Sequence, residues 1–394
     1  MVGDPIVIAS YARTPMGAFQ GALSSVKATE LGSVAIRAAV ERAGVAGSSI
    51  DRIYMGCVLP AGLGQAPARQ AALGAGLPES VQATTINKMC GSGMQAAIMA
   101  VEALQAGAAD VVVAGGMESM TNAPYALGKH RGGARIGHDR IIDTMMMDGL
   151  EDAYTPGKPM GAFAQDSANA YQFTRAMQDA FAIRSLERAR EAISSGAFSS
   201  EIAPVEVSAR DGSIIVDTDE QPGLAKPDKI PNLKPAFAVD GTITAASSAS
   251  ISDGAAALVL TRQGIANRLG ATPIARVIGC SAHAHAPSLF TTAPVAAIEK
   301  LLAQIGWSVS DVDLFEVNEA FAAVAMIAAT DLQIPDDKLN VNGGATALGH
   351  PIGASGARIV ATLLAALERR GLKRGVASLC IGGGEATAMA FEML

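Results

Sequence analysis

Residues 90–116 read CGSGMQAAIMAVEALQAGAADVVVAGG, and residues 352–384 show the same order of features in IGASGARIVATLLAALERRGLKRGVASLCIGGG. In each segment a glycine-containing turn leads into an Ala- and Leu-rich helical pattern, which gives way to a β-branched strand and a second glycine turn. Ser92 in the first segment matches Ser355 in the second at an offset of 263 residues. The match predicts that the chain contains an internal duplication.

A second pair of segments repeats at nearly the same distance. ELGSVAIRAAVERAG at residues 30–44 matches TTAPVAAIEKLLAQIG at residues 291–306, and the closing glycines lie 262 residues apart. Each half alternates such helical patterns with short β-branched runs, for example at residues 110–114 and 276–278. This alternation predicts an α/β fold of two duplicated βαβαβ halves around a mostly parallel, buried sheet.

The texture of the sequence changes between the two halves. Residues 121–250 are rich in Gly, Pro, Lys and Met, which predicts a loop-rich inserted domain with a few helices, the clearest at residues 175–195. We therefore divide the chain into a first half (residues 1–120 with 251–271), the insertion, and a second half (residues 272–394).

Composition excludes several classes of protein. The net charge is -7 and no run of Lys and Arg is present, which argues against a nucleic-acid partner. No apolar run approaches the roughly 20 residues of a membrane span, and the chain has no SKL-type ending. The four cysteines, Cys57, Cys90, Cys280 and Cys380, are too few and too widely spaced for a disulfide framework. We expect a cytoplasmic protein.

Cys90 lies in the turn before a predicted helix. A thiolate is the reactive form of cysteine, and a helix N-terminus favours negative charge, so we expect this position to lower the thiol pKa. Gly91 and Gly93 leave room for a substrate to approach the backbone. The position also suits a small buried cysteine at a strand–helix junction, and the residues alone leave both interpretations open.

His350 lies in another glycine-dense stretch, NVNGGATALGHPIGASGAR at residues 340–358. Pro351 follows it at the first turn of a predicted helix. The histidine either faces a cleft, where it would activate a cysteine or donate to a carbonyl oxygen, or belongs to a surface loop. The duplication favours the cleft, because it puts the loops of Cys90 and His350 at equivalent turns that can meet across a pseudo-twofold axis.

Two further stretches carry candidate groups. Cys380 ends a predicted strand and precedes three glycines, whose N–H groups either hold an oxyanion or belong to an ordinary turn. Asn318 lies at a strand-to-helix boundary, where it either caps the helix or orients a water beside His350. The pair His283 and His285 has metal-ligand spacing but no third ligand nearby, so we expect no metal site.

Five motifs in order resemble those of the thiolases, in particular the short-chain, acetoacetyl-CoA type of acetyl-CoA acetyltransferase. They span residues 87 to 386 and read NKMCGSGMQA, AGGMESM, EVNEAF, NVNGGATALGHPIGASGAR and LCIGGGEA. The resemblance covers essentially the whole chain. It implies a thiolase-like fold with mixed sheets, central helices and an inserted domain that binds CoA and makes tetramer contacts.

The resemblance also implies a role for each motif residue. Cys90 would accept the acyl group from a thioester and form an S-acyl-enzyme. His350 would activate Cys90 and, with a water held by Asn318, stabilise the thioester oxygen of an enolate. Cys380 would exchange the α-proton, and the amides of Cys90 and Gly382 would form an oxyanion hole. The resemblance implies no metal or redox cofactor, because the CoA thioester itself acidifies the α-carbon.

The insertion departs from the family pattern. Met160 matches the residue that limits acyl length, but Pro159 replaces the family's histidine beside it, and Ala249 replaces the serine that touches pantetheine. Two lysines stand near the place of a basic residue in the CoA-binding loop. The candidate substrate contacts are Met160, Ser247, Ala249, Lys226 and Lys229. We interpret residues 145–147, three methionines in a row, as packing or interface residues.

The resulting hypothesis is a reversible acetyl-CoA C-acetyltransferase of lipid and fatty acid metabolism, acting on acetyl-CoA, acetoacetyl-CoA and CoA as a homotetramer. The alternatives are a broader-range 3-ketoacyl-CoA thiolase and a non-catalytic CoA- or lipid-binding relative. A ketoacyl synthase would pair its cysteine with two histidines, whereas this chain offers one histidine and Cys380. A dinucleotide-dependent oxidoreductase is disfavoured because no GxGxxG follows the first predicted strand.

Overall fold

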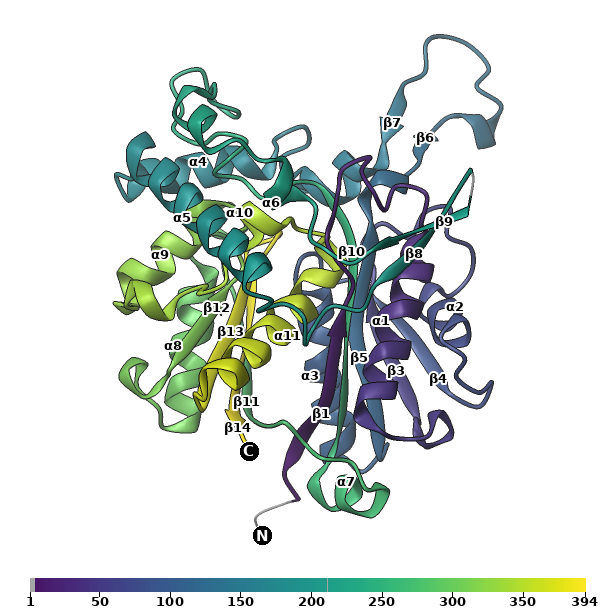
Figure 1. Ribbon diagram of the computed structural model, residues 1–394. Coiled ribbons are helices and arrows are strands. Elements are labelled where there is room, and N and C mark those ends of the chain that lie inside the picture. Colours follow the sequence, from purple (N-terminus) through teal and green to yellow (C-terminus); the bar gives the residue numbers. More distant parts are fainter. Residues whose placement is uncertain (1–3, 211) are drawn as a thin grey trace.

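Two central helices separate two halves of a large sheet in the computed structural model, which describes residues 4–210 and 212–394. These helices are α3 (Ser92–Gln105) and α11 (Ile352–Arg370), and they pack against each other and against strands of both halves. Helices α1 and α2 cover the outer face of one half of the sheet, and α8 covers the outer face of the other, with α9 beside it (Figure 1). The result is an α/β fold in five layers, which confirms the predicted fold class.

The elements have the following bounds. The strands are β1 Ile6–Arg13, β2 Gly17–Ala18, β3 Arg52–Gly56, β4 Gln82–Ile86, β5 Val111–Ser119, β6 Tyr125–Leu127, β7 Ile141–Asp143, β8 Val205–Ala209, β9 Gly212–Val216, β10 Ser252–Arg262, β11 Ala275–Ala284, β12 Leu314–Val317, β13 Arg374–Ile381 and β14 Glu385–Met393. The other helices are α1 Ala28–Ala43, α2 Pro67–Gly74, α4 Met160–Ala170, α5 Arg175–Ser194, α6 Gln221–Leu224, α7 Gln263–Leu269, α8 Ala293–Ile305, α9 Ala322–Leu332 and α10 Ala345–Leu348.

The sheet is mixed, with the strand order β12-β13-β14-β11-β1-β10-β5-β3-β4. The pairs β3/β4, β3/β5 and β12/β13 are parallel, but β10 and β14 run antiparallel to their neighbours. A mostly parallel sheet was therefore the wrong expectation. The reason is local, since the glycine turn after Ile381 is too short for a crossover and makes β13 and β14 an antiparallel hairpin. The two halves of the sheet meet where β1 pairs with β11 over two residue pairs.

The duplication is visible where α3 crosses α11. A Cβ on Gly93 would lie 2.8 Å from the Ala357 nitrogen, and a Cβ on the equivalent Gly356 would collide with the Met94 nitrogen. Each glycine therefore permits the other helix to approach its backbone closely. The equivalent helices α1 and α8 likewise end alike, at glycines with φ values of 65° and 70°.

The insertion covers one end of the two-sheet body and contains β6 to β9 and α4 to α6. The helix predicted at residues 175–195 is confirmed as α5, whose first turn is capped by the Thr174 hydroxyl accepting from the Met177 N–H. A segment at residues 123–143, which we call the β6–β7 excursion, projects at the upper right of Figure 1. In the described residues, no helix is both long and apolar enough to cross a membrane.

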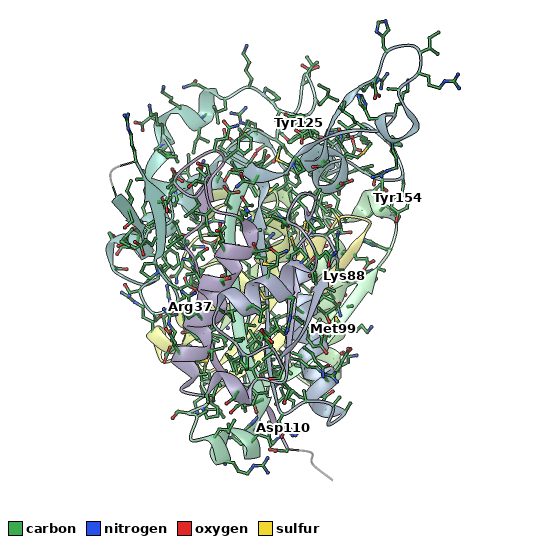
Figure 2. All side chains as sticks on the ribbon, turned by 90° about the vertical axis from the view of Figure 1, so that its right-hand side faces the viewer. Arg37, Lys88, Met99, Asp110, Tyr125 and Tyr154 are labelled. Atoms are coloured by element: carbon green, nitrogen blue, oxygen red, sulfur yellow. The ribbon has the colours of Figure 1, made fainter. Side chains whose placement is uncertain are left out.

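Figure 2 shows which end of the sheet faces the insertion. Asp110, directly before β5, lies at the bottom of this view, whereas Tyr125 and Tyr154 lie near the top and Lys88 lies between them and Asp110. Strand β5 therefore runs from the bottom toward the insertion. Loops that follow the strands at that end are the ones that form the candidate site.

Candidate active site

A cavity of about 590 Å³ opens where the loops of both halves meet the insertion. The first half contributes Cys90, the second half contributes His350, Cys380 and Gly382, and the insertion contributes Met160 and residues 147–154. The structure thus brings together three of the four predicted catalytic side chains around one space. The fourth, Asn318, does not line this cavity, although Ala320 and Phe321 next to it do.

The loop that carries Cys90 before α3 has a strained backbone at Met89. Met89 has a φ of 47°, a left-handed value that is unfavourable for a residue with a side chain. Three local hydrogen bonds hold it there. The Met89 N–H donates to the Asn87 side chain at 3.0 Å, the Lys88 N–H donates to the Ser92 hydroxyl at 2.8 Å, and that hydroxyl donates to the Met89 carbonyl at 2.6 Å. This tight turn places Cys90 at the cavity, immediately before the first turn of α3.

Cys90 is a thiol rather than a thiolate in this environment. Burial raises its pKa to about 11, and the backbone N–H groups of Gly382 and of Cys90 itself lower it without cancelling that rise. Our expectation of a lowered pKa was therefore wrong, because removal from water outweighs the helix N-terminus. The same two amides are those predicted for the oxyanion hole, and they interact with the Cys90 sulfur.

His350 is buried at the cavity, where one ring nitrogen has a hydrogen-bond partner and the other has none among the described residues. Its Nδ1 lies 2.5 Å from the Ser355 hydroxyl, and that hydroxyl lies 2.9 Å from the Pro351 carbonyl. A carbonyl only accepts, so the hydroxyl donates to Pro351 and accepts from Nδ1–H. The Nε2 atom then carries a lone pair, and it has no hydrogen-bond partner among the described residues. Burial, with a smaller contribution from Arg358, lowers the His350 pKa to about 3, so the imidazole is neutral.

The two halves support their reactive residues in the same way. Ser92 and Ser355 are equivalent in the duplication, and each lies in the first turn of a central helix. Ser92 bonds back to the loop of Cys90, and Ser355 bonds back to His350 and Pro351. The comparison of the two repeats paired these serines, but it assigned neither of them a role at the site.

Cys380 is the penultimate residue of β13, and the glycine turn at residues 382–384 follows Ile381. The thiol is 1% exposed, and burial together with the proximity of Cys90 raises its pKa well above the usual value. Gly383 and Gly384 have φ values of 92° and 86°, and a Cβ on Gly384 would lie 2.5 Å from the His285 carbonyl oxygen. The positive φ values and the close approach to His285 explain the glycines at positions 383 and 384. They leave the Gly382 N–H directed at Cys90.

Asn318 follows β12 and is buried beside an ion pair. Its side-chain oxygen accepts from Arg358 at 3.3 Å, and Arg358 contacts Glu316 at 3.1 Å. The Asn318 side-chain nitrogen is buried with no partner among the described residues. Helix α9 begins only at Ala322, so Asn318 does not cap it. This free donor in a buried position is available to a water or a ligand.

The predicted CoA contacts divide into two groups. Met160, the first residue of α4, and Ala249 line the cavity. Ser247 does not, because its hydroxyl faces inward and accepts the Thr244 N–H at 2.9 Å. Lys226 and Lys229 are exposed and also lie outside the cavity wall. The roles of Ser247, Lys226 and Lys229 as CoA contacts stay predictions.

Several wall residues had no assignment from the sequence. A π-helix at Met146–Leu150 starts the cavity wall that continues to Tyr154, and Met147 lines the cavity although it was interpreted as a packing or interface residue. Phe290 and Phe321 also line it, with ring centroids 6.3 Å apart. A π-helix has no sequence signature, so this part of the cavity wall could not be predicted from the sequence. Such segments are frequent at functional sites.

Glu118, in the AGGMESM motif, is a buried carboxylate that joins both halves. It accepts the N–H groups of Val58 at 2.9 Å, Leu59 at 3.1 Å and Gly353 at 2.9 Å. Burial raises its pKa to about 7, against the opposing effect of these three donors. Glu118 therefore fixes the loop after β3 and the first turn of α11, both of which contribute to the cavity wall.

The other histidines lie away from the cavity. His130, in the β6–β7 excursion, contacts Asp139 at 3.2 Å, and the rings of His283 and His285 stack edge to face with centroids 5.0 Å apart. Among residues 4–210 and 212–394, no group of three or more His, Cys, Asp or Glu side chains has the arrangement of a metal site.

Comparison with known proteins gives one answer along the whole chain. The thiolase N-terminal domain profile matches residues 6–264, and the thiolase C-terminal domain profile matches residues 271–393. Acetyl-CoA acetyltransferase 2 of Arabidopsis thaliana is 50% identical over 99% of this chain and 97% of its own. The acetyl-CoA acetyltransferase of Schizosaccharomyces pombe is 45% identical over 100% of both chains. The crystal structure of the Bacillus anthracis acetyl-CoA acetyltransferase superposes with a TM-score of 0.96 at 40% identity, over 99% of each chain. The chain therefore belongs to the thiolase family.

Proposed function

We propose that the protein is an acetyl-CoA C-acetyltransferase, which converts two molecules of acetyl-CoA into acetoacetyl-CoA and CoA and catalyses the reverse thiolysis. The observation that carries this proposal is the meeting of Cys90, His350, Cys380 and the Gly382 amide at one cavity. Two thiols with different surroundings, one neutral imidazole and two oxyanion donors are the groups that an acyl transfer followed by carbon–carbon bond formation requires.

In the first half-reaction, the Cys90 sulfur attacks the carbonyl carbon of acetyl-CoA. His350 Nε2 accepts the thiol proton, since its lone pair is free and its neutral state is set by burial. The thioester bond to CoA breaks, CoA leaves as a thiol with that proton, and an acetyl group stays on Cys90. The amides of Cys90 and Gly382 are placed to bind the oxyanion of the tetrahedral intermediate.

In the second half-reaction, the Cys380 thiol gives its proton to the free Nε2 of His350, and the resulting thiolate takes a proton from the α-carbon of a second acetyl-CoA. The Nε2–H that His350 then carries and a water held by the unpartnered Asn318 nitrogen donate hydrogen bonds to the enolate oxygen. The carbanion attacks the carbonyl of acetyl-Cys90, a carbon–carbon bond forms, and the bond to the Cys90 sulfur breaks. The departing Cys90 thiolate takes the Nε2 proton of His350, which restores the resting thiol and the neutral imidazole. No metal or redox cofactor takes part in these steps.

The test is the intact mass of the protein after brief exposure to acetoacetyl-CoA. We expect one acetyl adduct in the wild type and none in Cys90→Ser. Cys380→Ser is the matched control. Exposed to acetyl-CoA, whose transfer to Cys90 needs no exchange of an α-proton, it should still acquire the adduct while failing to cleave acetoacetyl-CoA or to condense two molecules of acetyl-CoA. A wild type that binds CoA without forming an adduct would exclude the proposal and support the non-catalytic relative.

The second candidate activity is that of a broader-range 3-ketoacyl-CoA thiolase. It is favoured by the part of the cavity wall that Met147 and Met160 form, because methionine side chains are flexible and Met147 is 55% exposed. Thiolysis rates for acyl chains of four to ten carbons distinguish the two. A steep loss beyond four carbons supports the acetoacetyl-CoA enzyme, and a flat profile supports the broader one.

We also infer that the protein is a cytoplasmic homotetramer of fatty acid metabolism. Two surface features support assembly. Strand β4 lies at the edge of the sheet with partly exposed residues, and the β6–β7 excursion carries Tyr125, Ile136 and Ile141, which are 69%, 93% and 71% exposed. Light scattering coupled to gel filtration measures the assembly directly, and a monomeric mass would exclude it.

A further inference from the structure

We propose that the ion pair between Lys88 and Glu385 is a positioning device that sets the distance between the nucleophile loop and the glycine turn, an inference that rests on the proposed function. Lys88 lies two residues before Cys90, and Glu385 follows Gly384 as the first residue of β14. The Lys88 ammonium contacts the Glu385 carboxylate directly. The pair thus joins a loop of the first half to a turn of the second, beside the two cysteines.

The nucleophile loop needs an anchor outside itself. The hydrogen bonds made by Asn87 and Ser92 fix the internal shape of the loop, and the Asn87 side chain also donates to the Val58 carbonyl at 3.5 Å, but all of these partners belong to the first half. The positive φ of Met89 means that this shape is stored strain, which persists only where the surroundings over-determine it. The Lys88 side chain supplies a bond from this loop to the opposite half.

The glycine turn also needs contacts from outside itself to fix its position. Residues 382–384 carry no side chains with which to fix themselves, and the Gly382 N–H must be aimed at the Cys90 sulfur. On one side the turn is held by the His285 N–H, which donates to the Gly384 carbonyl at 2.9 Å. On the other side Glu385 ties it to Lys88. Ile381 also packs toward this loop, since a Cβ on Gly91 would collide with its side chain.

The geometry explains why a charge pair at this place would act on rate more than on stability. The Lys88 and Glu385 side chains are 26% and 36% exposed, and a pair this accessible to water contributes little to folding. Oxyanion donors, in contrast, must lie within hydrogen-bond distance of the developing charge, so a small displacement of the turn from the loop reduces catalysis strongly. In Figure 2, Lys88 lies toward the right, below Tyr154, on the side of the molecule turned to the viewer.

The experiment uses charge reversal and its exchange. We expect Lys88→Glu and Glu385→Lys each to lower the rate of Cys90 acetylation by acetoacetyl-CoA about tenfold, because like charges would push the loop and the turn apart. The double variant Lys88→Glu with Glu385→Lys should recover most of this loss. The KM for CoA should stay within about twofold of the wild type, since neither Lys88 nor Glu385 lines the cavity.

A matched control lies on the same strand. Glu392, near the other end of β14, is 29% exposed and pairs with Arg276 at 3.4 Å and Arg374 at 3.5 Å. Glu392→Lys breaks surface ion pairs of the same kind far along β14 from the site, and we expect its acetylation rate to match the wild type. Thermal unfolding of every variant separates a loss of folding from a loss of geometry.

Three results would overturn the inference. They are single variants that are folded and acetylate within twofold of the wild type, a double variant no faster than the slower single, and a Glu392→Lys loss as large as that of Glu385→Lys. If the charge-reversal variants do not fold, the acetylation rates of the neutral variants Lys88→Met and Glu385→Gln are measured instead and compared with the wild type by the same criteria. Failure of the proposed function is distinguishable, because the wild type itself would then form no adduct on Cys90.

Discussion

Removal of the Ser355 hydroxyl tests whether His350 is held as a base. In the structure this hydroxyl accepts Nδ1–H of His350 at 2.5 Å and donates to the Pro351 carbonyl. Ser355→Ala deletes one atom from a fully buried position and leaves the helix backbone able to form as before. The tautomer with the lone pair on Nε2 then loses the contact that selects it.

The size of the effect on the acetylation rate follows from the hydrogen-bond donor that Ser355→Ala leaves without a partner. A buried donor left without a partner costs about 1–3 kcal/mol, and here the donor is Nδ1–H in the active tautomer and orientation. If that cost falls on the reactive arrangement, the rate of Cys90 acetylation drops by about 5- to 150-fold, since each 1.4 kcal/mol is tenfold. The KM for CoA should change little, because Ser355 does not line the cavity.

The assay is rapid-quench mass spectrometry of acetyl-Cys90 formation, with thermal unfolding measured in parallel. Ser281→Ala is the matched control, since Ser281 is a buried serine that donates to the Ala297 carbonyl at 2.6 Å and lies outside the cavity wall. We expect both variants to lose some stability but only Ser355→Ala to lose rate. A Ser355→Ala enzyme that acetylates within twofold of the wild type would refute the argument, as would an equal loss in Ser281→Ala.

Three further outcomes follow from burial. Because burial raises the Cys90 pKa to about 11, alkylation of Cys90 by iodoacetamide should rise steadily from pH 7 to 9.5, and a plateau below pH 7 would instead indicate a thiolate–imidazolium pair. Gly93→Ala should cost about 1–3 kcal/mol of unfolding free energy, because its Cβ would lie 2.8 Å from the Ala357 backbone, whereas Gly223→Ala, with open space around it, should cost far less in the same urea titration. The unfolded chain protonates His350 near pH 6.5 but the folded chain only near pH 3, so the free energy of unfolding falls as the pH drops below 6.5. Between pH 7 and 4.5, the wild type should lose about 3 kcal/mol more of this free energy than His350→Gln. Equal losses in the two proteins would contradict the lowered His350 pKa.

The duplication is what made the fold predictable from the sequence. Matching glycines and serines in the two halves identified the central helices and the turns that precede them, and the structure places those turns at a common cavity. The direction of β10 and β14 was missed, because helical and strand periodicity carries no information about which end of a sheet a strand enters. Turn length after Ile381 was the signal that could have corrected this.

The site was predictable where chemistry is local and not where it depends on packing. Cys90, His350 and Cys380 stand out because glycine-rich turns surround them. The Cys90 pKa could not be anticipated, since its rise comes from burial by residues distant in sequence and exceeds the local effect of the helix terminus. Lys226 and Lys229 lie outside the cavity wall, and their role as CoA contacts stays a prediction.

The neutrality of the resting site keeps the barrier to acyl transfer low in both directions. Burial keeps the Cys90 proton on sulfur and keeps His350 unprotonated, so the folded protein stores no buried ion pair at the cavity. Charge then appears only when a thioester carbonyl is attacked, and it appears where the Gly382 and Cys90 amides can bind it. Because exchange of one thioester for another is nearly isoenergetic, a site that stabilised a resting thiolate would add a barrier to acyl transfer in both directions. Two neutral groups with preorganised amides lower the barrier without favouring either side.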